Sequence, residues 1–184
     1  AMPSLVEQAR ALGALLDDAA LAPVLAALRL ERADLDPRCP VQVAGSGSTR
    51  LLIGLRDGAR LARLRPDNLA LARLSGQLEV AGFFPFSLAP AVPDCTSEAR
   101  MFCPAIGIAE DPVSGNAHGM LGVYLCAHRL LPVRDGHAAF TGRQGHHMRR
   151  GGRVQVEMEI ADAMVRTVTI AGEAVVVYEG QLRE

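Results

Sequence analysis

The residues best suited to chemistry form a short loop, Asp111-Pro112-Val113-Ser114-Gly115, directly before a long apolar segment. A helix that begins here leaves its first backbone amides without partners inside the helix. Those amides, together with the positive end of the helix dipole, can hold an anion or a carboxylate. Asp111 and Ser114 can add side chains at the same place, and Gly115 lets a ligand approach the backbone closely. The alternative is plain capping, because Asp or Ser before a helix is usually only a cap.

The segment that follows, residues 115–131, is predicted to be a buried helix. It is apolar nearly all round and rich in small residues, and Pro132 ends it. A helix without a polar face is normally buried. Small residues would let strands approach it closely, so we expect strands to wrap this helix rather than to form a sheet beneath it.

Other elements of the chain must position this loop and helix. Asp17-Asp18 should cap a helix that runs to about Leu30, and Pro66-Asp67 should open a helix to about Leu74, whereas Asp57-Gly58 is typical of a turn. Residues 1–16 are treated as a lead-in segment and residues 17–184 as the domain. The predicted strands are 41–44, 50–56, 79–86, 99–103, 153–160, 164–170 and 174–178, the last three as an antiparallel meander.

Composition excludes several classes of protein. The 184 residues suffice for one domain with a real core, since 49% are hydrophobic. The net charge of −1 does not favour a nucleic-acid partner. No apolar stretch is long enough for a membrane span, and the N-terminus lacks the pattern of a signal peptide. The cysteines lack disulfide or zinc spacing, so we expect a cytoplasmic protein without a metal; they are Cys39, Cys95, Cys103 and Cys126.

Residues 100–117 resemble the signature of the PhzF-like family of phenazine biosynthesis. An Arg-x-Phe-x-Pro strand is followed there by a Gly-Ile-x-Glu-Asp-Pro loop at the start of the central helix. Gln144-Gly145 with Arg150 resembles the family's Gln-Gly…Arg element. Residues 41–52, including Gly47, resemble its strand–glycine–strand segment. The similarity runs from about residue 17 to residue 180, and it matches the family's carboxyl-terminal lobe only.

This resemblance implies a fold of the diaminopimelate-epimerase type. Two similar lobes each wrap a mixed, largely antiparallel sheet or barrel around a central buried helix, which makes the fold class α+β. The substrate lies in the cleft between the two helix starts. Members of the family move protons as isomerases or epimerases without a metal or an organic cofactor. We therefore expect a small carboxylate-bearing metabolite as the ligand, and no cofactor.

The resemblance also assigns roles to residues. Asp111 matches an active-site aspartate of the family and is the expected catalytic residue. Ser114 stands where the family has threonine, and Asn116 stands where it usually has serine. The expected substrate-binding residues are Ser114, Gly115, Asn116, Ala117, His118 and Gly47. For His118, an ordinary core histidine is the alternative interpretation.

One part of the family's active site is missing from the chain. No residue before Asp17 matches the glutamate that serves as general base in the family's first lobe. A proton-transfer enzyme needs such a base, and only Glu110 or Asp111 is available near the loop. We therefore expect an isomerase-like lobe that a homodimer partner or a separate first-lobe chain completes. The alternatives are a non-catalytic carboxylate-binding module or truncated remnant, or a purely structural subunit.

Overall fold

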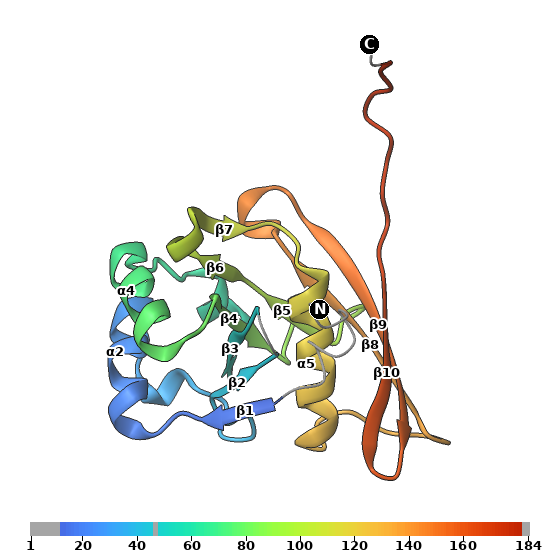
Figure 1. The fold of residues 1–184 in the computed structure, drawn as a ribbon, viewed down its shortest axis with the longest axis horizontal. Helices are drawn as coiled ribbons and strands as arrows, with labels where there is room; N and C mark the ends of the chain where they lie inside the picture. The colour runs from blue at the N-terminus through green and yellow to red at the C-terminus, as the bar shows by residue number, and fades with distance from the viewer. Residues whose placement is uncertain (1–11, 46–47, 182–184) are drawn as a thin grey trace.

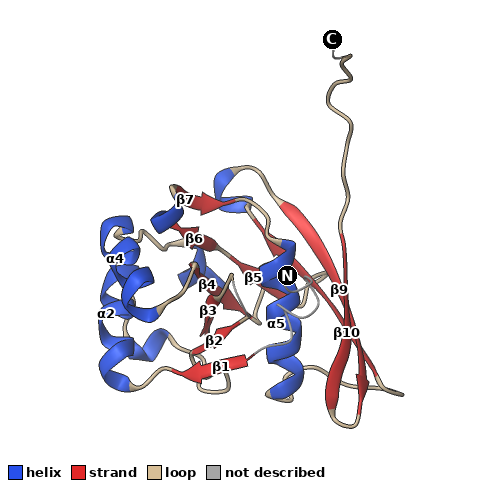
Figure 2. Cartoon of the chain, in the orientation of Figure 1, coloured by secondary structure: helices blue, strands red, loops and turns tan. Residues whose placement is uncertain are grey.

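The computed structural model describes residues 12–45 and 48–181. Within these residues a mixed sheet of ten strands curls around one central helix, and further helices cover the other face of the sheet (Figure 1). This arrangement confirms the α+β class and the expected helix wrapped by strands. It also places the start of the central helix near one rim of the curled sheet, where loops converge (Figure 2).

The path of the sheet is β1-β2-β3-β4-β5-β8-β9-β10, and β6 pairs with both β4 and β7. The strands are β1 (Leu12–Leu15), β2 (Gln42–Ala44), β3 (Arg50–Leu55), β4 (Gly82–Ser87), β5 (Ser97–Ala99), β6 (Met101–Cys103), β7 (Ile108–Asp111), β8 (His137–Gln144), β9 (Gly152–Ala161) and β10 (Met164–Ala171). The helices are α2 (Asp18–Leu28), α3 (Gly58–Ala62), α4 (Asn68–Leu78) and α5 (Gly115–Ala127), with short 3-10 turns η1 (Arg32–Asp34), η2 (Pro104–Ile106) and η3 (His146–Met148). The pairs β3–β4 and β5–β8 are parallel and the other pairs are antiparallel, as expected for a mixed, largely antiparallel sheet.

Each face of the sheet buries its own apolar cluster. In β3, Leu52 packs towards α5, whereas Leu51 and Ile53 pack towards α2 and α4. In β4, Phe84 packs towards α5, whereas Phe83 packs towards α2 and α4. A strand that is buried on both faces is a continuous apolar run rather than an alternating one. These two strands therefore fix the sheet between its two layers of helices.

The central helix α5 is buried as its composition indicates. All residues from 117 to 125 are buried. At Gly122, a β-carbon would lie 2.6 Å from the sulfur of Met158 and 3.2 Å from the ring of Phe140. The small residue thus allows β8 and β9 to pack directly on the helix. The helix ends at Ala127, earlier than predicted from the sequence.

The helix starts and the early strands were predicted well. Asp17 caps α2 by accepting a hydrogen bond from the amide of Ala20, and Asp67 caps α4 in the same way through the amide of Ala70. The strands β2 and β3 lie within the predicted ranges. β1 forms one edge of the sheet, so the described part of the lead-in segment joins the domain's sheet.

Four other predictions were wrong. The segment 174–178 forms no strand, because the residues after β10 leave the sheet and are exposed. The meander instead consists of β8, β9 and β10, and β8 was not predicted. Asp57 caps the short helix α3 through the amide of Ala59 instead of making a simple turn. The predicted strand 99–103 is interrupted at Arg100, where β5 ends and β6 begins.

Across the described parts of the chain, 12–45 and 48–181, no helix is long and apolar enough to cross a membrane.

Candidate functional site

The start of α5 carries the groups that the sequence singled out. Ser114 is the cap, and its hydroxyl accepts a hydrogen bond from the amide of Ala117 at 3.2 Å. The amides of Gly115 and Asn116 have no hydrogen-bond partner among the described residues. Two donors therefore remain free at the positive end of a buried helix, which is the arrangement that binds anions.

A hollow of about 630 Å³ lies beside this helix start. We call it the helix-start hollow; its lining residues are Val113, Gly115, His146, 151–154 and 170–175. Gly115 and Val113 therefore border open space instead of being sealed in the core. A small molecule can reach the amide end of α5 from this side.

Asp111 stands at the end of β7, immediately before the loop that leads into α5. Its carboxylate accepts a hydrogen bond of 3.3 Å from the amide of Val113. Asp111 forms no ion pair with another described residue. Its carboxylate is partly buried and has no charged partner among the described residues.

Gln144, at the end of β8, ties this loop to the sheet. Its amide nitrogen donates to the carbonyl of Asp111 at 2.6 Å, and its amide oxygen accepts from the backbone N–H of Ser114 at 3.2 Å. The side chain is almost completely buried, with 1% exposure. Both bonds are made by one planar group, so Gln144 fixes the spacing between the aspartate and the helix start. The sequence placed Gln144 in a matching motif but gave no sign of this contact.

Gly145 explains the second half of the Gln-Gly motif. It adopts a φ of +80°, which favours glycine. A β-carbon there would lie under 3.0 Å from the carbonyl oxygens of both Pro112 and Arg150. The absence of a side chain lets the β8–β9 connection pass directly against the loop of Asp111.

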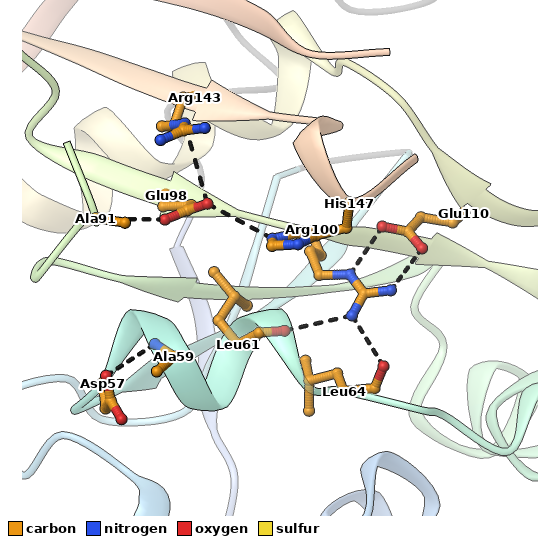
Figure 3. A network of polar contacts seen from close by, with 10 residues as sticks. All are labelled: Asp57, Ala59, Leu61, Leu64, Ala91, Glu98, Arg100, Glu110, Arg143 and His147. Carbon is orange, nitrogen blue, oxygen red and sulfur yellow. Dashed lines mark hydrogen bonds and ion pairs between the residues drawn. The ribbon is translucent and has the colours of Figure 1, made fainter. Parts of the chain in front are cut away.

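A buried ion pair holds β7 in place (Figure 3). Arg100 makes two hydrogen bonds to Glu110, at 2.8 and 2.7 Å, and also donates to the carbonyls of Leu61 and Leu64. The two charged side chains are only 6% and 15% exposed. Glu110 is therefore occupied as the structural partner of Arg100.

A second buried carboxylate, Glu98, is also engaged. It lies near Arg143 at 4.0 Å and His147 at 3.5 Å, and accepts a hydrogen bond from the amide of Ala91 (Figure 3). The His147 contact is the main cause that holds the pKa of Glu98 below its usual value, against burial, which raises it. Its strand neighbour Ser97 pairs with Gly142, which packs on α5, so alternation points Glu98 away from α5.

His118 lies in the core. Its side chain is fully buried, contacts the ring of Phe84 edge-on, and packs where Gly142 has no side chain. Its Nδ1 lies 2.8 Å from the carbonyl of Ser114, so Nδ1 carries the hydrogen and donates. Burial lowers the pKa of His118 to about 4, so the ring is neutral at pH 7. This placement matches the core-histidine interpretation and keeps the ring out of the helix-start hollow.

Of the remaining predicted site residues, one is buried and one is partly exposed. Ala117 is fully buried beneath the helix start, whereas Asn116 is partly exposed and its side-chain oxygen has no partner in the described parts of the chain. Gly47 lies outside the described residues. The structure therefore brings Asp111, Ser114, Gly115 and Asn116 together. No cluster of three or more histidine, cysteine or acidic residues with metal-site geometry occurs among the residues described.

Comparison with known proteins agrees with this architecture. The chain matches the family described as PhzC-PhzF, phenazine biosynthesis-like protein, over residues 14–180. The uncharacterized isomerase YddE of Escherichia coli K12 is 38% identical over 160 residues, which are 87% of this chain and 53% of YddE. The trans-2,3-dihydro-3-hydroxyanthranilate isomerase of Pseudomonas aeruginosa is 31% identical over 160 residues, 87% of this chain and 52% of that protein.

A crystal structure of a PhzF-family phenazine biosynthesis protein from Bacillus anthracis has the same fold. Its TM-score is 0.71 at 23% identity, over 81% of this chain and 50% of that one. The curled sheet around a buried helix is thus the fold of PhzF-like proteins. Because the family match covers most of its length, the chain belongs to the PhzC-PhzF family. It spans about half the length of the curated relatives it matches.

Proposed function

We propose that this chain is an isomerase lobe that binds a small carboxylate at the start of α5 and takes part in moving a proton on it. The observation that carries the proposal is the pair of unpartnered amides at Gly115 and Asn116, which lie beside the helix-start hollow and close in sequence to the unpaired carboxylate of Asp111. The Pseudomonas aeruginosa relative is a trans-2,3-dihydro-3-hydroxyanthranilate isomerase, and the compound in that name is a small carboxylate.

The chemistry follows from the charges at this site. A carbon acid that loses a proton next to its carboxylate develops further negative charge there. Amide hydrogens already aimed at that carboxylate stabilise the added charge without having to reorganise. Asp111 can accept or return the proton on one side of the substrate. Glu110 is paired with Arg100, and Glu98 contacts Arg143 and His147, so neither carboxylate is free to act as the second acid or base; we propose that this group comes from outside this lobe.

The missing group is best supplied by a second copy of the chain. The curated relatives are about twice as long as the matched region, so a pair of such lobes has the size of one relative. We propose a homodimer in which two α5 starts face one shared cleft; a separate first-lobe chain is the alternative partner.

We also propose that the protein works in the cytoplasm. Its four cysteines are free thiols, as is usual in a reducing compartment; they are Cys39, Cys95, Cys103 and Cys126.

The test combines ligand binding with solvent exchange. Trans-2,3-dihydro-3-hydroxyanthranilate, anthranilate and benzoate are titrated against the protein while the Gly115 amide is followed by NMR. The dihydro compound is then incubated with the protein in deuterated water, and label at carbon is measured. Asp111→Asn should bind but lose the label. The matched control, Asp162→Asn, changes an exposed hairpin aspartate and should retain the label.

Each outcome has a distinct meaning. Label that depends on Asp111 supports the isomerase. Binding at the Gly115 amide without deuterium label, in wild type and in both variants, supports the second candidate, a non-catalytic carboxylate-binding module. The contacts that already occupy Glu98 and Glu110 favour this candidate. A Gly115 amide that responds to none of the carboxylates refutes both functions.

A further inference from the structure

Arg50 is a buried arginine without a charged partner. It stands at the first position of β3 and is only 8% exposed. Its guanidinium forms no ion pair with another described residue, and its Nε–H has no hydrogen-bond partner among them. Its Nη1 makes the hydrogen bonds that it has, to the carbonyls of Ser48 and Thr49 and to the hydroxyl of Ser48. A buried cation and an unsatisfied buried donor are both costly, so the group indicates an acceptor that the described residues do not supply.

The strand register places Arg50 on the face of the sheet that is turned towards α5. It lies opposite Ala44 on β2, and Ala44 belongs to the apolar cluster around α5. Leu52, two residues further along β3, packs on the same face. On β4 the partner of Arg50 is Gly82, where a β-carbon would lie 3.4 Å from Cδ of Arg50 and 2.5 Å from the sulfur of Cys103. The missing side chain lets the arginine lie across β4, towards β6.

Arg50 lies at the end of the sheet where α5 begins. His118, in the first turn of α5, contacts the ring of Phe84 on β4. Further along the helix, Tyr124 donates a hydrogen bond to the carbonyl of Pro40, which precedes β2. The helix therefore runs away from Arg50, whose place on β3 is two residues before the level of Phe84. Because Nη1 bonds the residues that precede β3, the guanidinium is directed towards the rim at which α5 begins.

The carboxylate of Asp111 faces the same space as Arg50. Asp111 lies opposite Met101 on β6, and Met101 belongs to the cluster around α5, so both side chains are turned towards α5. The strands β3, β4, β6 and β7 lie side by side in this order (Figure 1). Burial lowers the pKa of Arg50 below its usual value, whereas Cys103 and Asp111 are near enough to raise it. A substrate group bound next to Asp111 is therefore also near an unpaired guanidinium.

We propose that Arg50 is a second anion-binding residue of the candidate site and that the substrate is a small dicarboxylate. This inference rests on the proposed function for the first carboxylate, which the amides of Gly115 and Asn116 hold beside the helix-start hollow. That hollow lies on the side of β9 and β10, whereas Arg50 approaches Asp111 from the side of β3 and β4. The two anion-binding groups thus flank Asp111, and each takes one carboxylate. The planar fork of a guanidinium matches a carboxylate with two parallel hydrogen bonds.

The experiment compares ligands that differ by one carboxylate. Benzoate and its ring dicarboxylates phthalate, isophthalate and terephthalate are titrated against the full chain by NMR. The Gly115 amide and the Arg50 Nε–H serve as separate reporters. At least one dicarboxylate should bind about tenfold more tightly than benzoate, the scale of one added charge-assisted hydrogen bond. The same dicarboxylate should shift the Arg50 Nε–H resonance, which benzoate should leave unchanged.

Three variants test whether Arg50 causes this preference for the dicarboxylate. Arg50→Met removes the cation and should abolish the preference while benzoate still binds. Arg50→Lys keeps a charge without the fork and should retain only part of the preference, and it replaces Arg50→Met if that variant does not fold by circular dichroism. Arg56→Met is the matched control, because Arg56 directly follows β3 and its Nε donates to the carbonyl of Leu35, on the other face of the sheet. It should keep the full preference.

The two reporters separate this inference from the proposed function. Equal binding of benzoate and all the dicarboxylates, or a preference that persists undiminished in Arg50→Met or Arg50→Lys, overturns the role of Arg50. A Gly115 amide that responds while the Arg50 Nε–H does not also overturns it, and leaves the proposed carboxylate site standing. A dicarboxylate that shifts only the Arg50 Nε–H supports Arg50 as an anion-binding residue and counts against the helix-start site. Responses of both reporters, with the preference lost in Arg50→Met, support both.

Discussion

Replacing Gly145 with alanine tests how the candidate site is held together. Gly145 has a φ of +80°, and a β-carbon there would press on the carbonyl oxygens of Pro112 and Arg150. Gly107 provides a matched control, because its φ is +82° and nothing lies within 4 Å of a β-carbon at that position. The two substitutions add the same methyl group in the same backbone conformation, and only one of them meets other atoms.

The expected magnitudes differ accordingly. Alanine in the left-handed region costs roughly 1–2 kcal/mol relative to glycine, and this cost applies to both variants. The clash at Gly145 involves backbone carbonyls, which cannot move aside as a side chain can. Forcing extra volume into a packed position adds typically about 1–3 kcal/mol. Gly145→Ala should therefore be less stable than Gly107→Ala by about that additional amount.

Urea unfolding followed by circular dichroism gives the free energies of both variants. The site supplies a second measurement, because Pro112 lies between Asp111 and the start of α5. Gly145→Ala should shift that loop and weaken carboxylate binding at the Gly115 amide, whereas Gly107→Ala should not. Equal destabilisation of the two variants, with binding unchanged, would show that the close approach is not what this glycine provides.

Three further outcomes are expected. Arg100→Met and Glu110→Gln should each cost about 3–5 kcal/mol, because each leaves a buried group without its partner, and the double variant should cost clearly less than their sum; additive losses in a urea double-mutant cycle would contradict this. His118 has a folded-state pKa of about 4, below its ordinary value of 6.5, so its stabilising effect is complete above pH 6.5 and is lost as the pH falls towards 4. His118→Phe should therefore lose less stability than wild type over that range, and parallel pH curves would argue against it. Asn116→Ala should change stability by less than about 0.5 kcal/mol, since its side-chain oxygen has no partner in the described residues, yet should weaken carboxylate binding measured by NMR.

The sequence predicted an element correctly where the contacts that define it lie within a few residues along the chain. Asp17, Asp67 and Ser114 were expected to lie at helix starts and do so, because a cap bonds an amide only a few residues away. The strand predicted over residues 153–160 likewise corresponds to β9. The interpretation of Ser114 as a plain cap is also correct for its hydroxyl, which the Ala117 amide occupies.

Strands far from their partners were harder to assign. β8 alternates between buried and exposed positions, but small residues such as Ala138 and Gly142 weaken the pattern that marks a strand. The segment 174–178 has the opposite character, with strong strand preference and no pairing within the described chain. Strand propensity measures how well side chains fit a half-buried pleated surface, and it does not tell whether another strand lies beside the segment.

The sequence by itself determined the buried helix α5, its start at Ser114-Gly115 and the adjacent Asp111, because helix caps and apolar composition act over short distances. Only the tertiary structure decided which of these groups remain free. In the folded chain Arg100 pairs with Glu110, and His118 is buried in the core. Gln144 bonds the backbone N–H of Ser114, which lies 30 residues before it in the sequence. Such contacts depend on which strands lie side by side, and that follows from the packing of the whole sheet around α5.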